Sequence, residues 1–472
     1  MKAQPNILII MTDQQAPQFS GPYGHPTVKT PTLDRLASEG VVFENAYTNC
    51  PICVPARMSY MTGRYVQNIG IWDNGVPLPE DTITWAHRLR AAGYSVSISG
   101  KIHFRGNDHL HGFEEQIGFD LNATAKPTPP DWSKPTPSKP QASDMRCGPG
   151  NTPEIETDTR VTAAALEYIR DAARKTAPWA LHVGYVCPHS PFIAPERYFE
   201  MYNPDRIDID LPEMPPGHLE NQHPAVKRNR AARGQPDATL PDAVVRRVRA
   251  SYYGLITFVD DMVGQLIEAL ESTGQRDDTL IIFTADHGEM MGEHGMWMKS
   301  NFYEHSSRIP MILSAPNQPF AGKRISDPVS LVDLVSTIVS VAGAATPEEP
   351  LAPLDGTSLL PLIHGEGKGP DDVFSEYYAN FSAAPMAMLR RGKYKFNYYL
   401  HEDAELYDLE DDPGEFRNLA SDSDHRNIRE DLENRLLERW DPHDIEERIL
   451  ASQADRRFLK PYLYRYLYGA NE

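Results

Sequence analysis

The stretch Asn6–Thr12, with the sequence NILIIMT, decides the fold that we expect of this 472-residue chain. It is a continuous apolar run rich in β-branched residues, which is typical of a strand buried on both faces of a parallel sheet. The polar residues Asp13 and Gln14 follow it directly. A sheet of this kind needs helices on both faces, so further strands should alternate with helices along the chain.

The chain shows this alternation as far as residue 365. Strands are predicted at 41–47, 94–99, 179–186, 279–285 and 310–314, and helices at 32–40, 84–92, 159–173, 243–271 and 331–342. Apolar residues in the helix at 243–271 recur with a period of about 3.6 residues. The pattern predicts an α/β domain over residues 1–365, built on a large, mostly parallel sheet sandwiched by helices.

Beyond residue 365 the pattern changes to short strands joined by turns. Strands at 373–378, 387–391 and 394–399 and a helix at 429–440 predict a smaller α+β subdomain with an antiparallel sheet over residues 366–440. The tail 441–472 ends in the aromatic run 462–468. We expect this tail to pack on a neighbouring subunit as an oligomerisation arm of a homodimer or homotetramer.

Two segments rich in proline, 126–153 and 204–241, are predicted to be long loops. Long ordered loops in enzymes often shape binding sites. We therefore expect one of them to contribute to the substrate pocket or to cover it as a lid.

The composition argues against several classes of partner. A formal net charge of −20 is unsuited to nucleic acid and to an anionic membrane surface. The first residues lack a signal sequence, and no apolar segment approaches the roughly 18 residues of a membrane span. Four cysteines do not make a disulfide framework. We expect a cytoplasmic enzyme, in which an anionic substrate would need a locally positive pocket.

Polar residues of the kinds that active sites use follow four of the predicted strands. They are Asp13, then Lys101 and His103, then His189, and finally Asp286 and His287. Ligands bind at the carboxyl ends of the strands in open α/β sheets, so these side chains should converge. Each residue alone could be a capped turn or a solvated polar group, but four such coincidences favour a site.

Asp13, Asp286 and His287 have the composition of a divalent-cation site. Two carboxylates supply hard negative charge, and an imidazole adds a nitrogen ligand. The amide oxygen of Gln14 could add a further ligand. Without a metal ion, two carboxylates in one dry pocket would repel each other.

The sequence Cys53-Val-Pro-Ala-Arg57 indicates a nucleophile at the start of a helix. Pro55 suits the first helical turn, and Gly63 suits the helix end. The free N–H groups at the helix N-terminus would favour an anion at Cys53, with Arg57 one turn further on. A buried structural cysteine, or a redox or zinc pair with Cys50, also fits the local sequence.

Cationic groups suit a tetrahedral, anionic ester as the substrate. Arg57, Lys101 and Lys299, together with His103 and His189, could stabilise charge on its nonbridging and leaving oxygens. Lys299 could equally be a solvated surface lysine.

The Cys53–Arg57 stretch and the following Thr62-Gly63-Arg64 resemble the signature of the sulfatase family, in the alkaline phosphatase superfamily. Further segments occur in sulfatase order over nearly the whole chain, at 6–14, 30–37, 100–103, 187–192, 252–264, 284–292 and 406–409. The resemblance implies an alkaline-phosphatase-like fold and a sulfuric ester hydrolase. It also implies that a maturation enzyme oxidises Cys53 to formylglycine, whose hydrate is the nucleophile.

The resemblance assigns roles to the candidate residues. It implies that Asp13, Asp286 and His287 bind the metal, together with the formylglycine at Cys53. Arg57 and Lys101 would hold the formylglycine hydrate. His103 would be the base that regenerates the aldehyde, and His189 and Lys299 would bind sulfate, one of them protonating the leaving alcohol.

Two features look closer to choline sulfatases and phosphonate monoester hydrolases than to other sulfatases. The first is the ligand pattern Asp13-Gln14 and Asp286-His287. Calcium is the first expectation for the metal, but this pattern makes manganese or zinc credible alternatives, because imidazole is a softer ligand than an amide oxygen. The second is the similarity of 101–104, 109–114 and the tail to choline sulfatases. A choline group would need an aromatic cage and a carboxylate, for which the candidates are His111, Trp132 and Glu376.

Three functions follow from these residues. The first is hydrolysis of a small sulfate monoester, as in an arylsulfatase or a choline sulfatase. The second is hydrolysis of phosphonate monoesters or phosphodiesters with the same nucleophile. The third is a degenerate protein that binds anions without turnover.

Overall fold

The computed structural model describes residues 4–120, 131–134, 145–174, 176–235, 239–315, 320–344 and 351–467, with side chains as far as residue 459. Its largest sheet has eight strands in the order β12-β2-β11-β9-β1-β7-β4-β5. These strands are β1 (Asn6–Thr12), β2 (Gly40–Phe43), β4 (Ser95–Gly100), β5 (Glu115–Gly118), β7 (Trp179–Gly184), β9 (Thr279–Ala285), β11 (Met311–Ser314) and β12 (Lys323–Ile325).

The sheet is mostly parallel, as the sequence predicts. Five of its seven neighbouring strand pairs are parallel, and β11 runs antiparallel to both β2 and β9. Strand β1 lies between β7 and β9. Leu8 and Ile10 belong to one hydrophobic cluster, whereas Ile7, Ile9 and Met11 belong to another. The strand is therefore buried on both faces, which explains its continuous apolar sequence.

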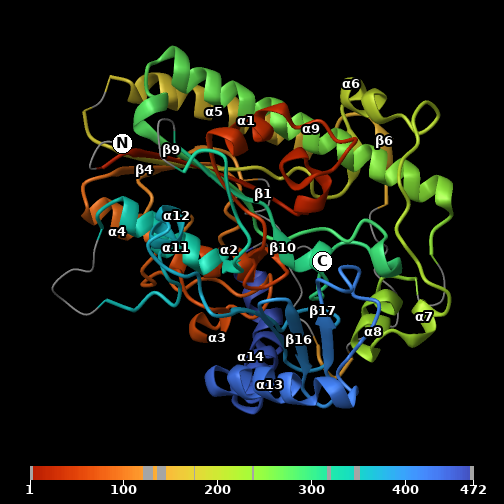
Figure 1. Ribbon diagram of the computed structural model, residues 1–472. Coiled ribbons are helices and arrows are strands. Elements are labelled where there is room, and N and C mark those ends of the chain that lie inside the picture. The colour runs from red at the N-terminus through yellow and green to blue at the C-terminus, as the bar shows by residue number, and fades with distance from the viewer. Residues whose placement is uncertain are drawn as a thin grey trace.

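Helices cover both faces of this sheet (Figure 1). One face carries α1 (Pro31–Glu39), α5 (Pro153–Ala172) and the long α9 (Asp242–Ser272). The other carries α2 (Cys53–Thr62), α4 (Trp85–Ala91) and α11 (Leu331–Val341). The predicted α/β sandwich is confirmed.

The predicted strand at 41–47 is wrong as a single element. The chain forms β2, turns, and continues as β3 (Ala46–Tyr47), which joins β10 (Arg308–Ile309) and β13 (Val329–Ser330) in a separate sheet. An apolar run records burial but not the sheet that a strand joins, so the sequence could not show this change of partner.

The predicted loop at 204–241 is also partly wrong, because it contains α7 (His218–Asn221) and α8 (Pro224–Ala232). Pro224 begins α8, and the side chain of His223 accepts a hydrogen bond from the Ala225 N–H. This proline therefore begins a helix rather than interrupting one. Most of the other predicted loop, 126–153, lies outside the described residues.

A second sheet begins after residue 365. It contains β14 (Val373–Tyr377), β15 (Met386–Arg391), β16 (Tyr394–Tyr399) and β17 (Glu405–Asp408), all antiparallel, followed by α13 (Arg426–Arg439) and α14 (Pro442–Leu467). Its core includes Tyr47 and Trp72 from the N-terminal part of the chain. The subdomain boundaries at residues 365 and 440 stay predictions.

Besides six 3₁₀-helices, the remaining elements of the described chain are short α-helices and strands. They are α3 (Val66–Ile69), α6 (Glu196–Phe199), α10 (Glu304–Ser307), α12 (Leu360–His364), β6 (Cys147–Pro149) and β8 (Phe192–Ala194).

Part of the predicted oligomerisation arm packs on its own chain. Ile445 and Ile449 of α14 are buried in the core of the second sheet. Arg456 forms an ion pair with Asp73, with an Nη2–Oδ2 distance of 2.7 Å. These contacts hold this part of the tail on its own chain. The predicted contact of the tail with a neighbouring subunit stays a prediction. The side chains of the aromatic run 462–468 lie outside the described residues.

Within the described residues, no helix combines the length and apolar character that crossing a membrane would require.

Helix α1 depends on a carboxylate from α9. The side chain of its N-cap residue, Thr30, makes no capping hydrogen bond. Instead, the buried Asp260 accepts hydrogen bonds from the N–H groups of Thr32, at 2.9 Å, and Leu33, at 2.8 Å. Burial raises the pKa of Asp260 to about 7, although these N–H groups act in the opposite direction. The carboxyl group satisfies two donors that the helix start leaves without intrahelical partners.

We expect Asp260→Ala to destabilise the fold by about 1–3 kcal/mol, because two N–H groups at the start of α1 would lose their acceptor. Thermal unfolding followed by circular dichroism would measure the loss. Glu268→Ala, at an exposed position on the same helix, is the control and should change the midpoint little. Equal midpoints for the two variants would contradict the role of Asp260.

Candidate active site

Cys53 is the first residue of α2, as the sequence predicts. Ile52 is the N-cap in an extended conformation, and Gly63 ends the helix with a φ of 68°. The Val54 N–H donates to the side-chain oxygen of Asn74 at 3.0 Å. Cys53 itself is 3% exposed. The helix N-terminus therefore holds Cys53 inside the protein.

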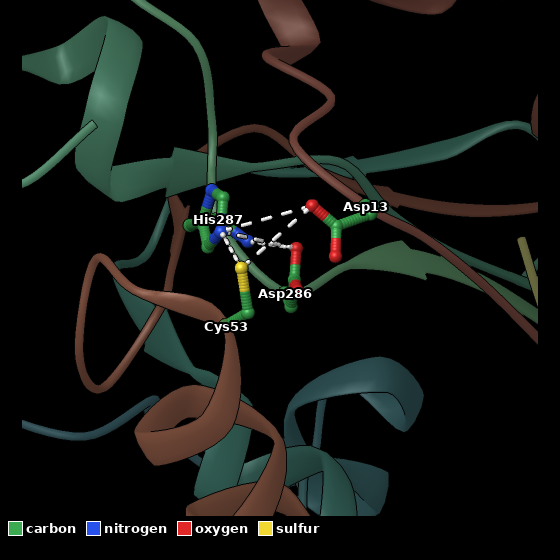
Figure 2. Close-up of side chains that lie close together, drawn as sticks. All are labelled: Asp13, Cys53, Asp286 and His287. Atoms are coloured by element: carbon green, nitrogen blue, oxygen red, sulfur yellow. Dashed lines mark hydrogen bonds and ion pairs between the residues drawn. The ribbon is translucent and has the colours of Figure 1, made fainter. Parts of the chain in front are cut away.

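Strand pairing brings the predicted metal ligands together. Thr12 of β1 lies opposite Ala285 of β9, so Asp13 and Asp286 leave the sheet side by side. Figure 2 shows that Asp13, Asp286 and His287 point toward Cys53. One donor atom from each of these four residues lies within 4.8 Å of the others. The Cys53 Sγ is 3.2 Å from His287 Nε2 and 3.9 Å from Asp13 Oδ1.

This donor set could hold a divalent metal ion. Two carboxylates and an imidazole are common ligands of such ions, and all four side chains are buried. Water cannot screen the two carboxylates here, so a cation is the natural partner for them. The ligands suit calcium, manganese or zinc without selecting one of them.

Arg57 and Lys101 balance the charge of the carboxylates. Arg57 Nε lies 2.8 Å from Asp286 Oδ2, and its Nη2 lies 3.3 Å from Asp13 Oδ2. Lys101 Nζ lies 2.5 Å from the same oxygen of Asp13. Burial alone would raise the pKa of Asp13, but the charges of Lys101 and Arg57 outweigh it and hold the pKa well below its usual value. Asp13 is therefore ionised.

His103 lies in a strained loop after β4. Its φ is 72°, and its N–H donates to the Asp120 carboxylate at 2.7 Å, beside a 3.1 Å bond from Ile102. Its Nε2 lies 2.6 Å from a guanidinium nitrogen of Arg105. Burial, followed by the charges of Lys101 and Arg105, lowers the pKa of His103 well below its usual value. The imidazole is neutral. A guanidinium group only donates, so Nε2 accepts from Arg105 and Nδ1 carries the hydrogen.

His189 and Lys299 form a second pair. Lys299 Nζ lies 3.1 Å from His189 Nε2, and His189 Nδ1 lies 2.6 Å from the Ser190 carbonyl oxygen. A carbonyl can only accept, so Nδ1 carries the hydrogen and Nε2 accepts from Lys299. Burial, followed by the Lys299 charge, lowers the pKa of His189 to about 3. The pair thus consists of an ammonium donor and a neutral imidazole.

Gln14 lies beside this pair rather than among the four donors. Its amide oxygen accepts a hydrogen bond from Lys299, and its Nε2 donates to Glu289 Oε2 at 2.5 Å. The predicted ligand role of Gln14 stays a prediction. Glu289, Asn74, Arg105 and Asp120 were not predicted from the sequence. The position of Glu289, three residues after Asp286, was a signal that could have drawn attention to it.

The three predicted substrate-binding residues lie in different surroundings. His111 packs on Phe104, with 4.5 Å between ring centroids. The backbone N–H of Trp132 donates to Gln453 at 3.2 Å. Glu376, in β14, accepts from the Gln67 N–H and from Tyr378.

Among the described residues, no hydrogen bond, ion pair or ring contact joins His111, Trp132 or Glu376 to the Asp13–Cys53–Asp286–His287 group. Burial raises the pKa of Glu376 to about 8, so this group supplies little negative charge at pH 7. That is a poor environment for a quaternary ammonium ion.

Comparison with known proteins identifies the family. Residues 5–344 match the sequence model of the sulfatase family. Residues 292–441 match the model described as N-sulphoglucosamine sulphohydrolase, C-terminal. Together the two matches cover both sheets.

Similar proteins include sulfatases and phosphonate monoester hydrolases. A choline-sulfatase of Rhizobium meliloti is 33% identical over 96% of this chain and 90% of its own length. A multifunctional alkaline phosphatase superfamily protein of Trinickia caryophylli is 31% identical over 92% of this chain and 94% of its own. The structure of a phosphonate monoester hydrolase from Silicibacter pomeroyi superposes with a TM-score of 0.76 and 28% identity, covering 92% of this chain and 95% of that one. The chain therefore belongs to the sulfatase family of the alkaline phosphatase superfamily, and the protein is a sulfatase enzyme.

Proposed function

We propose that this sulfatase hydrolyses small sulfate monoesters, with a formylglycine formed from Cys53 as the nucleophile and one divalent metal ion as cofactor. The position of Cys53 is the observation that carries the proposal. Its Sγ shares one buried group with the donors of Asp13, Asp286 and His287. A side chain at this point would contact both the metal and a substrate bound at the helix N-terminus.

The two groups that the family implies have defined tasks. Formylglycine supplies a hydrated aldehyde as the nucleophile, and the metal supplies Lewis-acid stabilisation of negative charge. Asp13, Asp286 and His287 would hold the metal. The Gln14 amide oxygen has two lone pairs, so it could be a further ligand while its other lone pair accepts from Lys299. Calcium is the first expectation, and manganese or zinc are the alternatives.

The charge balance supports an anionic substrate. Asp13 and Asp286 are already neutralised by Arg57 and Lys101. A divalent cation would therefore make the site net positive, inside a protein with a formal charge of −20. A sulfate ester carries the negative charge that this pocket lacks.

The remaining residues move or hold protons. Lys299 Nζ donates to His189 Nε2 and to Gln14, which leaves its third hydrogen for a sulfate or leaving-group oxygen. His189 keeps this ammonium group in place. His103, neutral because of burial and its cationic neighbours, would be the base that accepts a proton when the nucleophile at Cys53 is regenerated. Its Nε2 would take up that proton in exchange for the hydrogen bond from Arg105.

Hydrolysis of phosphonate monoesters or phosphodiesters is the second candidate. The ligand pattern Asp286-His287 and the similarity to the phosphonate monoester hydrolase structure favour it. Both reactions transfer a tetrahedral anionic group to the same nucleophile, so one site could catalyse both. A choline leaving group is supported by the choline-sulfatase relative alone. Its candidate contacts His111, Trp132 and Glu376 have no hydrogen bond, ion pair or ring contact with the Asp13–Cys53–Asp286–His287 group among the described residues.

The proposed modification requires a maturation enzyme as a partner. Because Cys53 is 3% exposed in the folded protein, such an enzyme would act before this part of the chain folds. The homo-oligomeric assembly and the cytoplasmic location stay predictions.

Cys53→Ala should lower kcat/KM for 4-nitrophenyl sulfate by at least about 10⁴-fold, because it removes the nucleophile. The thermal midpoint should stay close to that of the wild type. Cys147→Ala, at a half-buried position on β6, is the control and should keep full activity. Peptide mass spectrometry should find an aldehyde in place of the Cys53 thiol, and an active enzyme with an intact thiol would refute the assignment.

Chelation of the metal should abolish turnover and lower the thermal midpoint by several degrees, because a bound ion stabilises the native state by mass action. Adding back calcium, manganese or zinc separately, with activity as the readout, identifies the metal. Asp286→Asn should show little further response to chelator. An untreated enzyme that contains no metal by elemental analysis and is fully active would rule out the cofactor.

The ratio of kcat/KM for 4-nitrophenyl sulfate to that for a phenyl phosphonate ester distinguishes the two candidate reactions. We expect the sulfate ester to be favoured by at least about tenfold, corresponding to about 1.4 kcal/mol in the transition state. A ratio that strongly favours the phosphonate ester would make phosphonate hydrolysis the main activity.

A further inference from the structure

Glu289 is a buried carboxylate beside the active site to which the sulfatase reaction assigns no task. It is 0% exposed and lies two residues after His287. Its Oε1 accepts from two backbone N–H groups, those of Met291 at 3.0 Å and Met298 at 2.7 Å. Its Oε2 accepts from the Gln14 amide at 2.5 Å. One carboxylate oxygen of Glu289 thus binds the backbone of the loop at residues 291 and 298, and the other binds the Gln14 side chain.

The side-chain amide of Gln14 can hydrogen-bond to both Lys299 and Glu289 in only one orientation. Its oxygen accepts from the Lys299 ammonium group, and its nitrogen donates to Glu289. Turning the amide over would put its N–H₂ group against an ammonium group and its oxygen against a carboxylate. Both contacts would be repulsive, because an ammonium group only donates and a carboxylate only accepts.

The backbone of Gln14 is held as firmly as its side chain. Its φ of 68° lies in the left-handed region, which costs energy for a residue other than glycine. Its N–H donates to Asp286 Oδ1 at 3.1 Å, and its carbonyl oxygen accepts from the Tyr252 hydroxyl at 2.7 Å. The backbone of Gln14 is therefore fixed by these two hydrogen bonds, and only the orientation of its side-chain amide remains to be determined.

We propose that Glu289 is a positioning residue, which orients the Gln14 amide so that its oxygen holds Lys299 for binding the sulfate group. This inference rests on the proposed function and adds a residue to its sulfate-binding pair. The order of contacts is Glu289 to Gln14, Gln14 to Lys299, and Lys299 to His189. Lys299 is then held from two sides, and its remaining hydrogen has a defined direction.

The isosteric variant Glu289→Gln separates this role from holding the loop. Its amide oxygen can still accept from the Met291 and Met298 N–H groups, so the loop keeps its bonds. Its N–H₂ group would face the N–H₂ group of Gln14, and two donors cannot bond to each other. Gln14 would lose its orientation, and Lys299 would lose its acceptor.

A reciprocal exchange tests the direct contact. In the double variant Gln14→Glu/Glu289→Gln, the new amide at 289 donates to the new carboxylate at 14, whose other oxygen accepts from Lys299. The net charge of the site equals that of the wild type. Gln14→Glu alone places two carboxylates together and should be impaired, which gives a second single variant if Glu289→Gln does not fold.

Two measurements serve as readouts for folded variants. The first is the Kd for inorganic sulfate, measured by isothermal titration calorimetry, and the second is kcat/KM for 4-nitrophenyl sulfate. We expect Glu289→Gln to weaken sulfate binding by about tenfold and to lower kcat/KM by about 10- to 100-fold, since small misplacements of site groups have effects of this size. The double variant should recover both quantities to within about fivefold of the wild type, which is the signature of direct coupling.

Glu405→Gln is the matched control. Glu405 is a buried carboxylate in β17 that accepts from the Tyr399 and Tyr407 hydroxyls, and the variant should keep wild-type sulfate binding. Wild-type sulfate binding in Glu289→Gln, or a double variant no better than its single variants, would overturn the proposal. If the wild type binds sulfate without turning over the ester, the proposed function fails, whereas the coupling in sulfate binding still tests the role of Glu289.

Discussion

Two carboxylates, Asp13 and Asp286, follow the carboxyl ends of the adjacent strands β1 and β9, and both are fully buried. Removing such charges from water costs several kcal/mol for each unless partners compensate. Arg57 contacts both carboxylates, and Lys101 contacts Asp13. The arrangement of the site depends on the neutralisation of these two carboxylates. Arg57 comes from α2 and Lys101 follows β4, so neutralisation requires both elements to meet the ends of β1 and β9.

This constraint also determines where Cys53 lies. Arg57 lies one turn after Cys53 on α2, so the ion pairs that neutralise the carboxylates also bring the N-terminus of this helix against the ends of β1 and β9. Lys101 ties the end of β4 to the same point. The site is therefore assembled by electrostatic pairing on a scaffold whose hydrophobic clusters cover both faces of the sheet. A chain with a formal net charge of −20 thus keeps two cations paired with two carboxylates in one buried site.

Much of the fold could be predicted, because buried strands and amphipathic helices have strong periodic patterns. The strands Asn6–Thr12 and Thr279–Ala285 and the helix at 243–271 were predicted to within a residue or two. The segment 41–47 and the region around α8 were not, for different reasons. In the first, the strand changes its partner sheet without changing its apolar pattern, and in the second a proline begins a helix.

Site residues could be predicted where they directly follow the ends of strands. Residues that depend on tertiary packing could not be predicted. The structure brings Asp13, Cys53, Asp286 and His287 together, as expected from parallel strands that end at one edge. It does not join the proposed choline contacts to this group among the described residues. Glu289 was missed, because a glutamate in a loop has no pattern that reveals which amide it orients.

The sequence by itself determined the class of fold, the strands that end in polar site residues, and the family. These follow from local periodicity and from motifs of a few residues. The tertiary structure decided which charges neutralise each other, which nitrogen of His189 carries the hydrogen, and which way the Gln14 amide faces. These properties depend on distances of about 3 Å between residues far apart in the chain, where hydrogen bonds have their full strength. Local sequence patterns contain no information about such distances.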